Sequence, residues 1–440
     1  MPEKLVRRDL VVERGYSGLR ITTGRVWEEF DRALRGQQGV RLYEEMRRND
    51  PVLGAVNNAI DLVLRGVKWR AQAASEEVQA QEEAVFLDSC MGDMSHSWND
   101  LLSEVLSFIP FGWAYFEVVY KERKGEAADP PSAYDDGRIV WRKVVLRGQE
   151  SLDRWDMDEH GGIRAMIQRP DFYGGGIRVS TPIPIEKAVL FRTKREKNNP
   201  EGQSFYRNAV RPYTLKKGLE DIESIGYERD LTGIPVVYLP IGANDTDFGK
   251  AQDLVERVHV DDQAGLVFEQ LGAEDHQNWR FELISAPGGS KASDLNTAIQ
   301  RVSGEISMVF LAQFLRLGQQ RVGSYALAKE HKDLFHLALS SILDNIEETM
   351  ERFLLPPLMR LNGVPRRFWP SLIHDPIAEA DIQGLASFVG TLSQAGMITY
   401  SRELENSLRR QADLPELVEA EAAGSEALRW AKEYMEQERV

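Results

Sequence analysis

The spacing of apolar residues between positions 295 and 357 predicts two long helices. In the first, apolar residues recur every three or four positions, as in an amphipathic helix: Leu295, Ile299, Val302, Ile306 and Val309. Ser293 or Asp294 is its expected N-cap. A second apolar stripe starts near residue 324 and ends at Pro356 and Pro357, because proline interrupts a helix. At ~1.5 Å per residue the second helix is about 45 Å long, too long for a small compact core.

A short polar link, residues 315–323, joins these two helices. Its long polar side chains are Arg316, Gln319, Gln320 and Arg321, and Gly318 and Gly323 lie on either side of Arg321. Such a link is either a solvated helix connection or a mobile element that contacts a polyanion. The residues of the link alone leave both interpretations open.

The region before these helices mixes helical and alternating patterns, which predicts an α+β domain over residues 41–203. Asp50 and Pro51 open a helix, and further helices are expected at 76–91 and 98–109. Alternation of apolar and polar residues predicts strands at 67–73, 113–120, 139–146, 152–157, 163–168 and 185–192. Residues 1–40 form an N-terminal arm, which we expect to pack on a neighbouring molecule or on the main body.

A helix with one insertion follows this domain. Residues 204–210 are helical, Pro212 interrupts them, and an apolar stripe continues to residue 231 through Leu215, Leu219, Ile222 and Ile225. We place Lys216, Lys217, Glu220, Asp221, Ser224 and Glu228 on the opposite, polar face. An inserted module (residues 232–288) then carries strands at 235–240, 265–269 and 281–285 and a helix at 253–258. The helices on either side of it must run antiparallel.

The charge balance limits the possible partners. The 440 residues include 54 Lys and Arg against 69 Asp and Glu, a net charge of −15. This balance argues against a broad basic face that grips nucleic acid, because tight binding requires neutralised phosphates. Acidic residues outnumber basic ones in the inserted module, and they include Asp245, Asp247, Asp253 and Glu256. The chain contains a single Cys90 and no apolar run near the length of a membrane span, which predicts a protein of a reducing cytoplasm without membrane contact.

No motif of the sequence predicts an active site, a metal site or a cofactor. The seven histidines are scattered, and His331 and His336 are too far apart to chelate from one helix face. The glycines at 174–176 precede no helix, so a phosphate cradle is not expected. Asp135–Asp136 and Asp261–Asp262 lie in turn contexts, where local hydrogen bonding explains them better than a metal does. We expect no catalytic residue, and a nucleic-acid enzyme that uses these carboxylates is the weakest alternative.

The order of the elements resembles the portal proteins of tailed bacteriophages, in particular the Mu-like branch. Residues 215–239 (LKKGLEDIESIGYERDLTGIPVVYL) resemble the family's long helix running into a G-x-P strand. Residues 323–331 (GSYALAKEH) resemble its G-S-x-A-L-x-x-x-H helix start. Residues 381–417, which end with Asp413, Leu414, Pro415 and Glu416, resemble its helical tail. The similarity extends over nearly the whole chain.

The resemblance implies an α+β fold with named parts. They are an N-terminal arm (1–40), an α+β wing (41–203), two stem helices (204–231 and 289–314), a clip (232–288), a tunnel loop (315–323), a long wing helix with its return (324–376), and an all-helical crown (377–440). It also implies a homo-oligomeric ring, usually of twelve subunits, at one capsid vertex of the virion, assembled in the host cytoplasm. Such a ring is the channel for DNA packaging and ejection.

The resemblance further implies partners and roles for particular residues. Partners are double-stranded DNA, terminase, head–tail connector proteins, and capsid and scaffold proteins, with no cofactor. Arg316, Gln319, Gln320 and Arg321 would contact DNA, while Gly318 and Gly323 would act as hinges of the loop. The acidic residues of the clip would contact the motor or the connector. The alternative is another head–tail connector or adaptor ring without a DNA-contacting loop.

Overall fold

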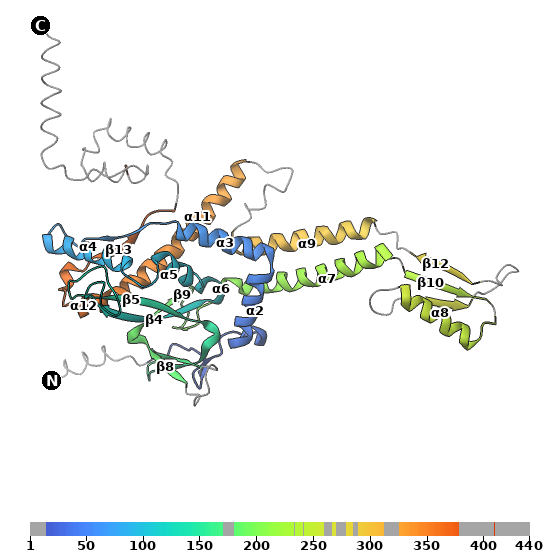
Figure 1. Cartoon of the computed structure of the whole chain (residues 1–440), viewed down its shortest axis with the longest axis horizontal. Coiled ribbons are helices and arrows are strands. Elements are labelled where there is room, and N and C mark those ends of the chain that lie inside the picture. Colours follow the sequence, from blue (N-terminus) through green and yellow to red (C-terminus); the bar gives the residue numbers. More distant parts are fainter. Residues whose placement is uncertain are drawn as a thin grey trace, which may run out of the picture. The chain divides into compact units, whose positions relative to one another are not determined.

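The computed structural model describes residues 15–169, 180–232, 234–240, 242–258, 266–269, 279–284, 289–311 and 325–377, together with residue 409. The chain divides into two compact units, Met1–Asp375 and Pro376–Val440. Helices and strands are mixed along the first unit (Figure 1), so the predicted α+β class is confirmed. The all-helical crown expected over residues 377–440 lies outside the described residues, apart from residues 377 and 409.

The N-terminal part of the described chain packs on its own body. Strands β1 (Ile21–Thr22) and β2 (Arg25–Val26) form a hairpin. At its turn Gly24 has a φ of +79°, and a Cβ there would lie 2.3 Å from the carbonyl oxygen of Trp155. Only glycine fits this turn, because it has no Cβ and adopts positive φ freely.

Two helices, α2 (Gly36–Asn49) and α3 (Pro51–Arg65), meet at Asp50. As predicted, Asp50 caps α3, and its Oδ1 accepts hydrogen bonds from the backbone N–H groups of Val52 and Leu53, both at 2.9 Å. Helix α2 begins before residue 41, so it crosses the boundary expected between the arm and the wing.

Six strands form two antiparallel sheets of three strands each. The first has the order β5-β4-β9 and the second β6-β7-β8. Their bounds are β4 (Trp113–Glu122), β5 (Ile139–Arg147), β6 (Leu152–Met157), β7 (Ile163–Gln168), β8 (Thr181–Pro184) and β9 (Ala188–Arg192). The strand expected at 185–192 begins only at Ala188, because Ile185–Lys187 form a 3-10 turn, η3. The sequence did not predict β8, whose Pro182 and Pro184 argue against a strand.

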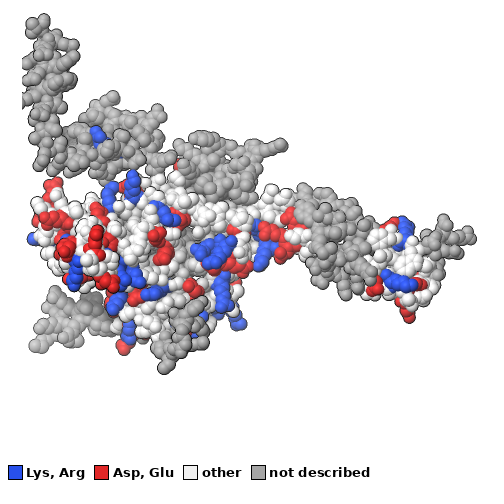
Figure 2. Space-filling view, viewed as in Figure 1, with Lys and Arg blue, Asp and Glu red and all other residues white. Residues whose placement is uncertain are grey.

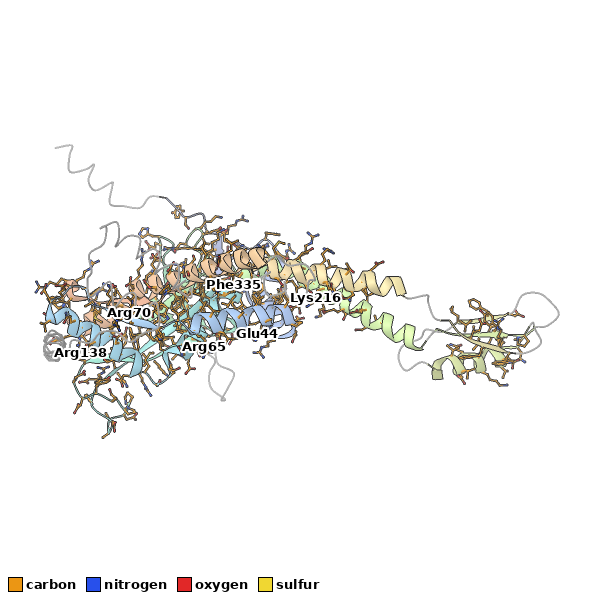
Figure 3. The ribbon with its side chains drawn as sticks, turned by 90° about the horizontal axis from the view of Figure 1, so that it is seen from above. Glu44, Arg65, Arg70, Arg138, Lys216 and Phe335 are labelled. Atoms are coloured by element: carbon orange, nitrogen blue, oxygen red, sulfur yellow. The ribbon has the colours of Figure 1, made fainter. Side chains whose placement is uncertain are left out.

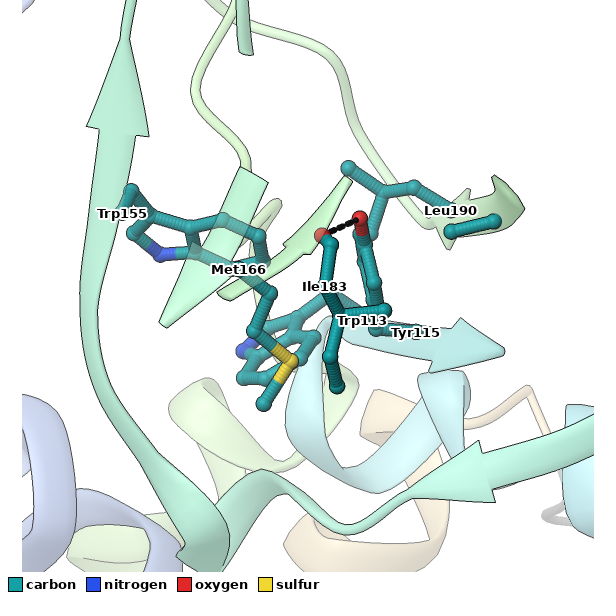
Figure 4. Packing of buried hydrophobic residues seen from close by; sticks show 7 residues of the cluster. Trp113, Tyr115, Trp155, Met166, Ile183 and Leu190 are labelled. Carbon is teal, nitrogen blue, oxygen red and sulfur yellow. Dashed lines mark hydrogen bonds between the residues drawn. The ribbon is translucent and has the colours of Figure 1, made fainter. Parts of the chain in front are cut away.

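Aromatic and aliphatic side chains from both sheets form one buried core (Figure 4). The rings of Trp113 and Trp155 lie edge to face with their centroids 5.1 Å apart. The hydroxyl of Tyr115 donates a hydrogen bond to the carbonyl oxygen of Ile183 at 2.8 Å. This bond satisfies the one polar atom that Tyr115 brings into the core and ties β4 to β8.

Short helices and one small sheet complete this region. The helices are α4 (Val78–Gly92), α5 (Trp98–Val105) and α6 (Phe108–Phe111), so the helix expected at 98–109 is divided in two. Strand β3 (Trp69–Gln72) pairs with β13 (Ser371–His374), which brings the end of the first unit back onto its beginning. This pairing joins segments about 300 residues apart in sequence, which spacing patterns do not reveal.

The long helix continues past its predicted end. It consists of α11 (Tyr325–Thr349), a π-helical turn η5 (Met350–Leu354) and α12 (Leu355–Leu361). The predicted stop at Pro356 and Pro357 is therefore wrong. Both prolines lie in the first turn of α12, directly after the wider π-helical turn, where proline is tolerated. The chain then passes through a 3-10 turn, η6 (Arg366–Phe368).

The remaining elements form a helix pair with an inserted module. They are η4 (Phe205–Ala209), α7 (Val210–Thr232), β10 (Ile234–Leu239), α8 (Asp245–Val258), β11 (Leu266–Glu269), β12 (Arg280–Ile284) and α9 (Gly289–Val309). Pro212 does not interrupt α7, because it lies in the first turn. Ser293 and Asp294 are not the N-cap of α9, which begins at Gly289. Helix α8 starts at Asp245 and not at Asp253, since the Asn244 side chain accepts a hydrogen bond from the backbone N–H of Asp247 at 3.0 Å.

Candidate functional site on the paired helices and the inserted module

Helices α7 and α9 lie side by side (Figures 1 and 3). They run antiparallel as predicted, because α7 leads into the inserted module and α9 returns from it. In that module α8 covers one face of a sheet with the order β11-β10-β12. Val237, Leu239, Ala251 and Val255 form its buried core.

The exposure of α7 differs in part from what its sequence predicted, although Lys217, Glu220, Asp221 and Ser224 of the predicted polar face are exposed. The side chain of Lys216, expected on the polar face, is only 4% exposed. Ile222 and Ile225, which belong to the predicted core stripe, are exposed, Ile222 to 59%. Leu215 is exposed as well. The apolar stripe of α7 is therefore exposed, whereas an amphipathic helix on the surface of a globular protein usually turns such a stripe to the core.

Lys216 is buried because it binds a carboxylate at the start of α3. Its Nζ donates a hydrogen bond to Oδ2 of Asp50 at 2.7 Å, and both side chains are almost fully buried. Figure 3 shows Lys216 where α7 meets the α2–α3 corner. The other carboxylate oxygen of Asp50 caps α3, so one side chain ties two helices together. Removing one partner of such a pair costs about 3–5 kcal/mol, since a charge is left buried without its counterion.

A second contact joins α7 to α2. The hydroxyl of Tyr213 and the ammonium of Lys217 both donate to Oε1 of Glu45, at 3.0 and 2.7 Å. The hydrogen bond from Lys217 is the largest of the effects that lower the pKa of Glu45, and the bond from Tyr213 adds to it. Burial raises the pKa of Tyr213 to about 12, and Glu45 contributes in the same direction. The start of α7 is thus held firmly on the body.

The exposed stripe of α7 borders an apolar groove of about 670 Å³. Leu215, Gly218 and Ile222 line it on one side, and Phe30 and Leu34 line it on the other. Phe30 is 79% exposed. Arg207 holds this segment, because its guanidinium donates two hydrogen bonds to Glu29 at 2.8 and 2.9 Å and lies 4.7 Å from the ring of Phe30.

The described end of α9 leads into the predicted loop. Val302 and Ile306 are buried, whereas Met308 and Leu311 are exposed. Leu311 has a φ of +55°, which is strained for a residue with a Cβ and ends the helix abruptly. All six loop residues expected to contact DNA or to act as hinges lie outside the described residues: Arg316, Gly318, Gln319, Gln320, Arg321 and Gly323.

The structure places the predicted acidic residues of the inserted module on α8. Asp245 and Asp247 occupy its first turn, where the helix dipole favours negative charge, and Asp253 is exposed two turns later. Lys250 lies 3.8 Å from Asp247. Glu256 belongs to the same helix, but its side chain lies outside the described residues. On the face that Figure 2 shows, acidic and basic side chains are interspersed.

Of the turn carboxylates, Asp136 has a local partner. Oδ1 of Asp136 accepts from the backbone N–H of Arg138 at 2.9 Å, which is the local bonding expected of a turn aspartate. Asp261 and Asp262 lie outside the described residues. Across the described ranges, no three His, Cys, Asp or Glu side chains gather in a way that could hold a metal ion. No described helix is long and apolar enough to cross a membrane.

The sequence did not predict the exposed apolar stripe of α7 or the groove beside it. Neither the burial of Lys216 nor the exposure of Ile222 follows from periodicity, because periodicity finds the apolar face of a helix without saying what covers it. The available signal was Phe30, an aromatic residue between the acidic residues Glu29 and Asp31.

Comparison with known proteins adds independent information. The sequence pattern of the family described as the portal protein of Mu bacteriophage matches residues 40–414. The solved neck of an empty GTA particle with C6 symmetry is similar over 86% of this chain and 94% of that chain, with a TM-score of 0.52 and 13% identity. The neck of a native GTA particle with C12 symmetry gives the same coverage and TM-score at 11% identity. An HK97 family phage portal protein from Corynebacterium diphtheriae has a TM-score of 0.36 and 10% identity, over 74% of this chain and 92% of that chain.

At such low identities the structural likeness concerns the fold alone, and the family match over residues 40–414 carries the assignment. That match spans the body, the paired helices and the inserted module, in the order that the sequence predicted. The chain belongs to the family of the Mu bacteriophage portal protein.

Proposed function

We propose that this chain assembles into a closed ring at one vertex of a phage capsid, where the ring is the channel for DNA packaging and ejection. The observation that carries the proposal is the exposed apolar stripe of α7. An α-helix that buries its lysine and exposes its isoleucines needs a partner surface. The structure of the neck of the native GTA particle, which shares this fold, was computed with C12 symmetry, and we propose twelve subunits here.

In this assembly the stripe of one subunit packs on the helix pair of the next. Met308 and Leu311, exposed at the end of α9, are suitable apolar partners. A contact between two different faces of the same chain closes into a ring when the rotation per subunit divides a full turn. Because the chain carries a net charge of −15, the channel wall would hold phosphates weakly and let DNA move.

The experiment is a charge substitution within the stripe. We expect Ile222→Asp/Ile225→Asp to abolish rings and leave folded single subunits, as measured by mass photometry and circular dichroism. The matched control is Val78→Asp/Val85→Asp, which changes two exposed valines of α4, Val85 being 69% exposed. The control is expected to form rings normally. Rings from the α7 variant, or a parent chain that stays monomeric under all conditions, would contradict the proposal.

The remaining functional assignments belong to this proposal. Residues 41–203 and 324–376 form the wing, α7 and α9 the stem, the inserted module the clip, and residues 377–440 the crown. Arg316, Gln319, Gln320 and Arg321 contact DNA in the tunnel, with Gly318 and Gly323 as hinges. Normal DNA packaging and retention by Arg316→Ala/Arg321→Ala would remove that role. Assembly takes place in the host cytoplasm, with capsid and scaffold proteins.

The acidic residues of α8 are proposed to dock terminase and then the head–tail connector proteins. Asp245 and Asp253 are exposed, and Asp247, which lies near Lys250, is partly so, which leaves these carboxylates accessible to a basic partner. Reversing the charges of Asp245, Asp247, Asp253 and Glu256 is expected to weaken terminase binding without affecting the ring. Unchanged binding would reject the assignment.

A further inference from the structure

Strand β4 has a partner along only part of one edge. On that edge β9 begins at Ala188, which lies opposite Glu117. The residues before Ala188 form the 3-10 turn η3 and leave the sheet. Across the described ranges, no strand pairs with residues 118–122 on this side. An unpaired edge presents free backbone N–H and C=O groups that another extended segment can bind.

A groove of about 1300 Å³ follows this open edge. Four consecutive residues of β4, positions 117–120, line it. Successive side chains of a strand point to opposite faces, so a groove that contacts four in a row must follow the edge of the backbone. The groove therefore has the geometry of a site where an extra strand adds to a sheet.

The opposite wall of the groove is mixed, because Glu351, Arg352, Arg360 and Arg366 line it together with apolar side chains. Phe353 of the π-helical turn and Leu361 of α12 line it, and both are about half exposed, at 50% and 49%. Pro356 and Pro357 lie between them on the same wall. An occupant of this groove would therefore pair its backbone with β4 and place apolar side chains against Phe353 and Leu361.

We propose that the occupant is a segment within residues 1–14 of the same chain, which binds as an additional strand. The described chain begins at Gly15, and Ile21 of β1 packs on the core cluster that contains Ala188. Ile185 packs on the same cluster and also lines the groove, so this cluster connects β1, the first strand of the described chain, with the groove. Fourteen extended residues reach about 46 Å at ~3.3 Å each.

The composition of this segment suits a strand. Leu10, Val11 and Val12 follow one another, and valine favours extended backbone. In a strand, Leu10 and Val12 point to the same face and can both contact Phe353 and Leu361 of the opposite wall. This proposal does not depend on ring formation. Either of the two proposals can be refuted without affecting the other.

Amide hydrogen exchange of the full chain tests this directly. In the parent chain we expect the groove-facing amides within 118–122 to exchange slowly. In the variants Leu10→Asp/Val12→Asp and Phe353→Asp, these amides are expected to exchange at least tenfold faster than in the parent chain. The matched control is Leu337→Asp, another exposed apolar residue of the same long helix, which is expected to change nothing there.

A second measurement covers the case in which Phe353→Asp fails to fold. A fluorescent peptide of residues 1–14 is expected to bind a chain that lacks residues 2–14, and to bind the parent chain at least tenfold more weakly. Equal exchange at 118–122 in the parent and the Leu10→Asp/Val12→Asp variant would overturn the proposal. The proposal would also be overturned if the peptide bound the parent chain as tightly as the shortened chain. Protection from exchange that disappears on dilution would overturn it too, since the occupant would then belong to another molecule.

Discussion

Two buried carboxylates, Asp50 and Asp93, show how single residues hold this chain together. Asp50 joins α3 to α7. The other, Asp93, fixes the loop between β4 and β5: it accepts hydrogen bonds from Lys121 Nζ and Arg123 Nε at 3.1 Å, and from Ser132 Oγ at 2.7 Å. Each buried charge has more than one partner, as the cost of burying an ion requires.

Replacing Lys216 by methionine is expected to lower the free energy of unfolding by about 3 kcal/mol, the low end for a broken buried pair, because the capping bonds still hold Asp50. The double variant Asp50→Asn/Lys216→Met should recover more than half of the loss, since asparagine also caps a helix and no charge remains buried. Urea denaturation followed by circular dichroism measures both. A Lys216→Met chain as stable as the parent would show that the pair contributes little.

Asp93 makes the free energy of unfolding depend on pH. Burial by itself raises the pKa of Asp93, but the hydrogen bonds from Ser132, Lys121 and Ala133 outweigh it, so the pKa lies below the ordinary value of 3.8. A carboxylate with a lowered pKa in the folded state stabilises above its unfolded pKa, and this contribution is lost as the pH falls through the folded pKa. We expect Asp93→Asn to be less stable than the parent at pH 6 and to lose less stability between pH 4 and pH 2. Parallel stability curves for the two chains would contradict this.

At the scale of elements, the sequence predicted what local spacing controls. The hairpin of β6 and β7 was predicted at its observed bounds, and α3 begins at its predicted cap. What the sequence did not predict depends on contacts between distant residues. Strand β13 forms by pairing with β3, and the hydrogen bond to Asp50 buries Lys216 of α7. For the candidate site, sequence placed the acidic residues in the correct module but put Lys216 and the isoleucines of α7 on the wrong faces.

The π-helical turn explains why two prolines fail to end the long helix. Pro356→Ala is expected to change the free energy of unfolding by less than about 1 kcal/mol, because a proline in the first turn of a helix removes no intrahelical hydrogen bond. Deleting Glu351 should shorten the π-helical turn by one residue and place Pro356 in an ordinary helix interior, at a cost of roughly 3 kcal/mol. Thermal unfolding of both variants measures the difference. Equal losses would show that the turn does not accommodate the prolines.

At the scale of the whole molecule, charge opposes assembly. Each chain carries a net charge of −15, so identical subunits repel one another at low salt. Because the Debye length falls to about 10 Å at 0.1 M salt, added salt should weaken the repulsion while the apolar contacts of α7 remain. We expect the ring fraction to rise between 10 mM and 300 mM NaCl, as measured by analytical ultracentrifugation. A fall over that range would mean that ion pairs, and not apolar contacts, hold the subunits together.

The open edge of β4 also matters before any ring exists. In the proposed assembly, subunits accumulate in the host cytoplasm before they are incorporated, and a bare strand edge can pair with the same edge of another copy. Such pairing leads to precipitation, which competes with productive assembly for the same pool of chains. If the first residues of the chain cover this edge, shortening the N-terminus would reduce the yield of soluble protein while leaving the melting temperature of the remaining fold nearly unchanged.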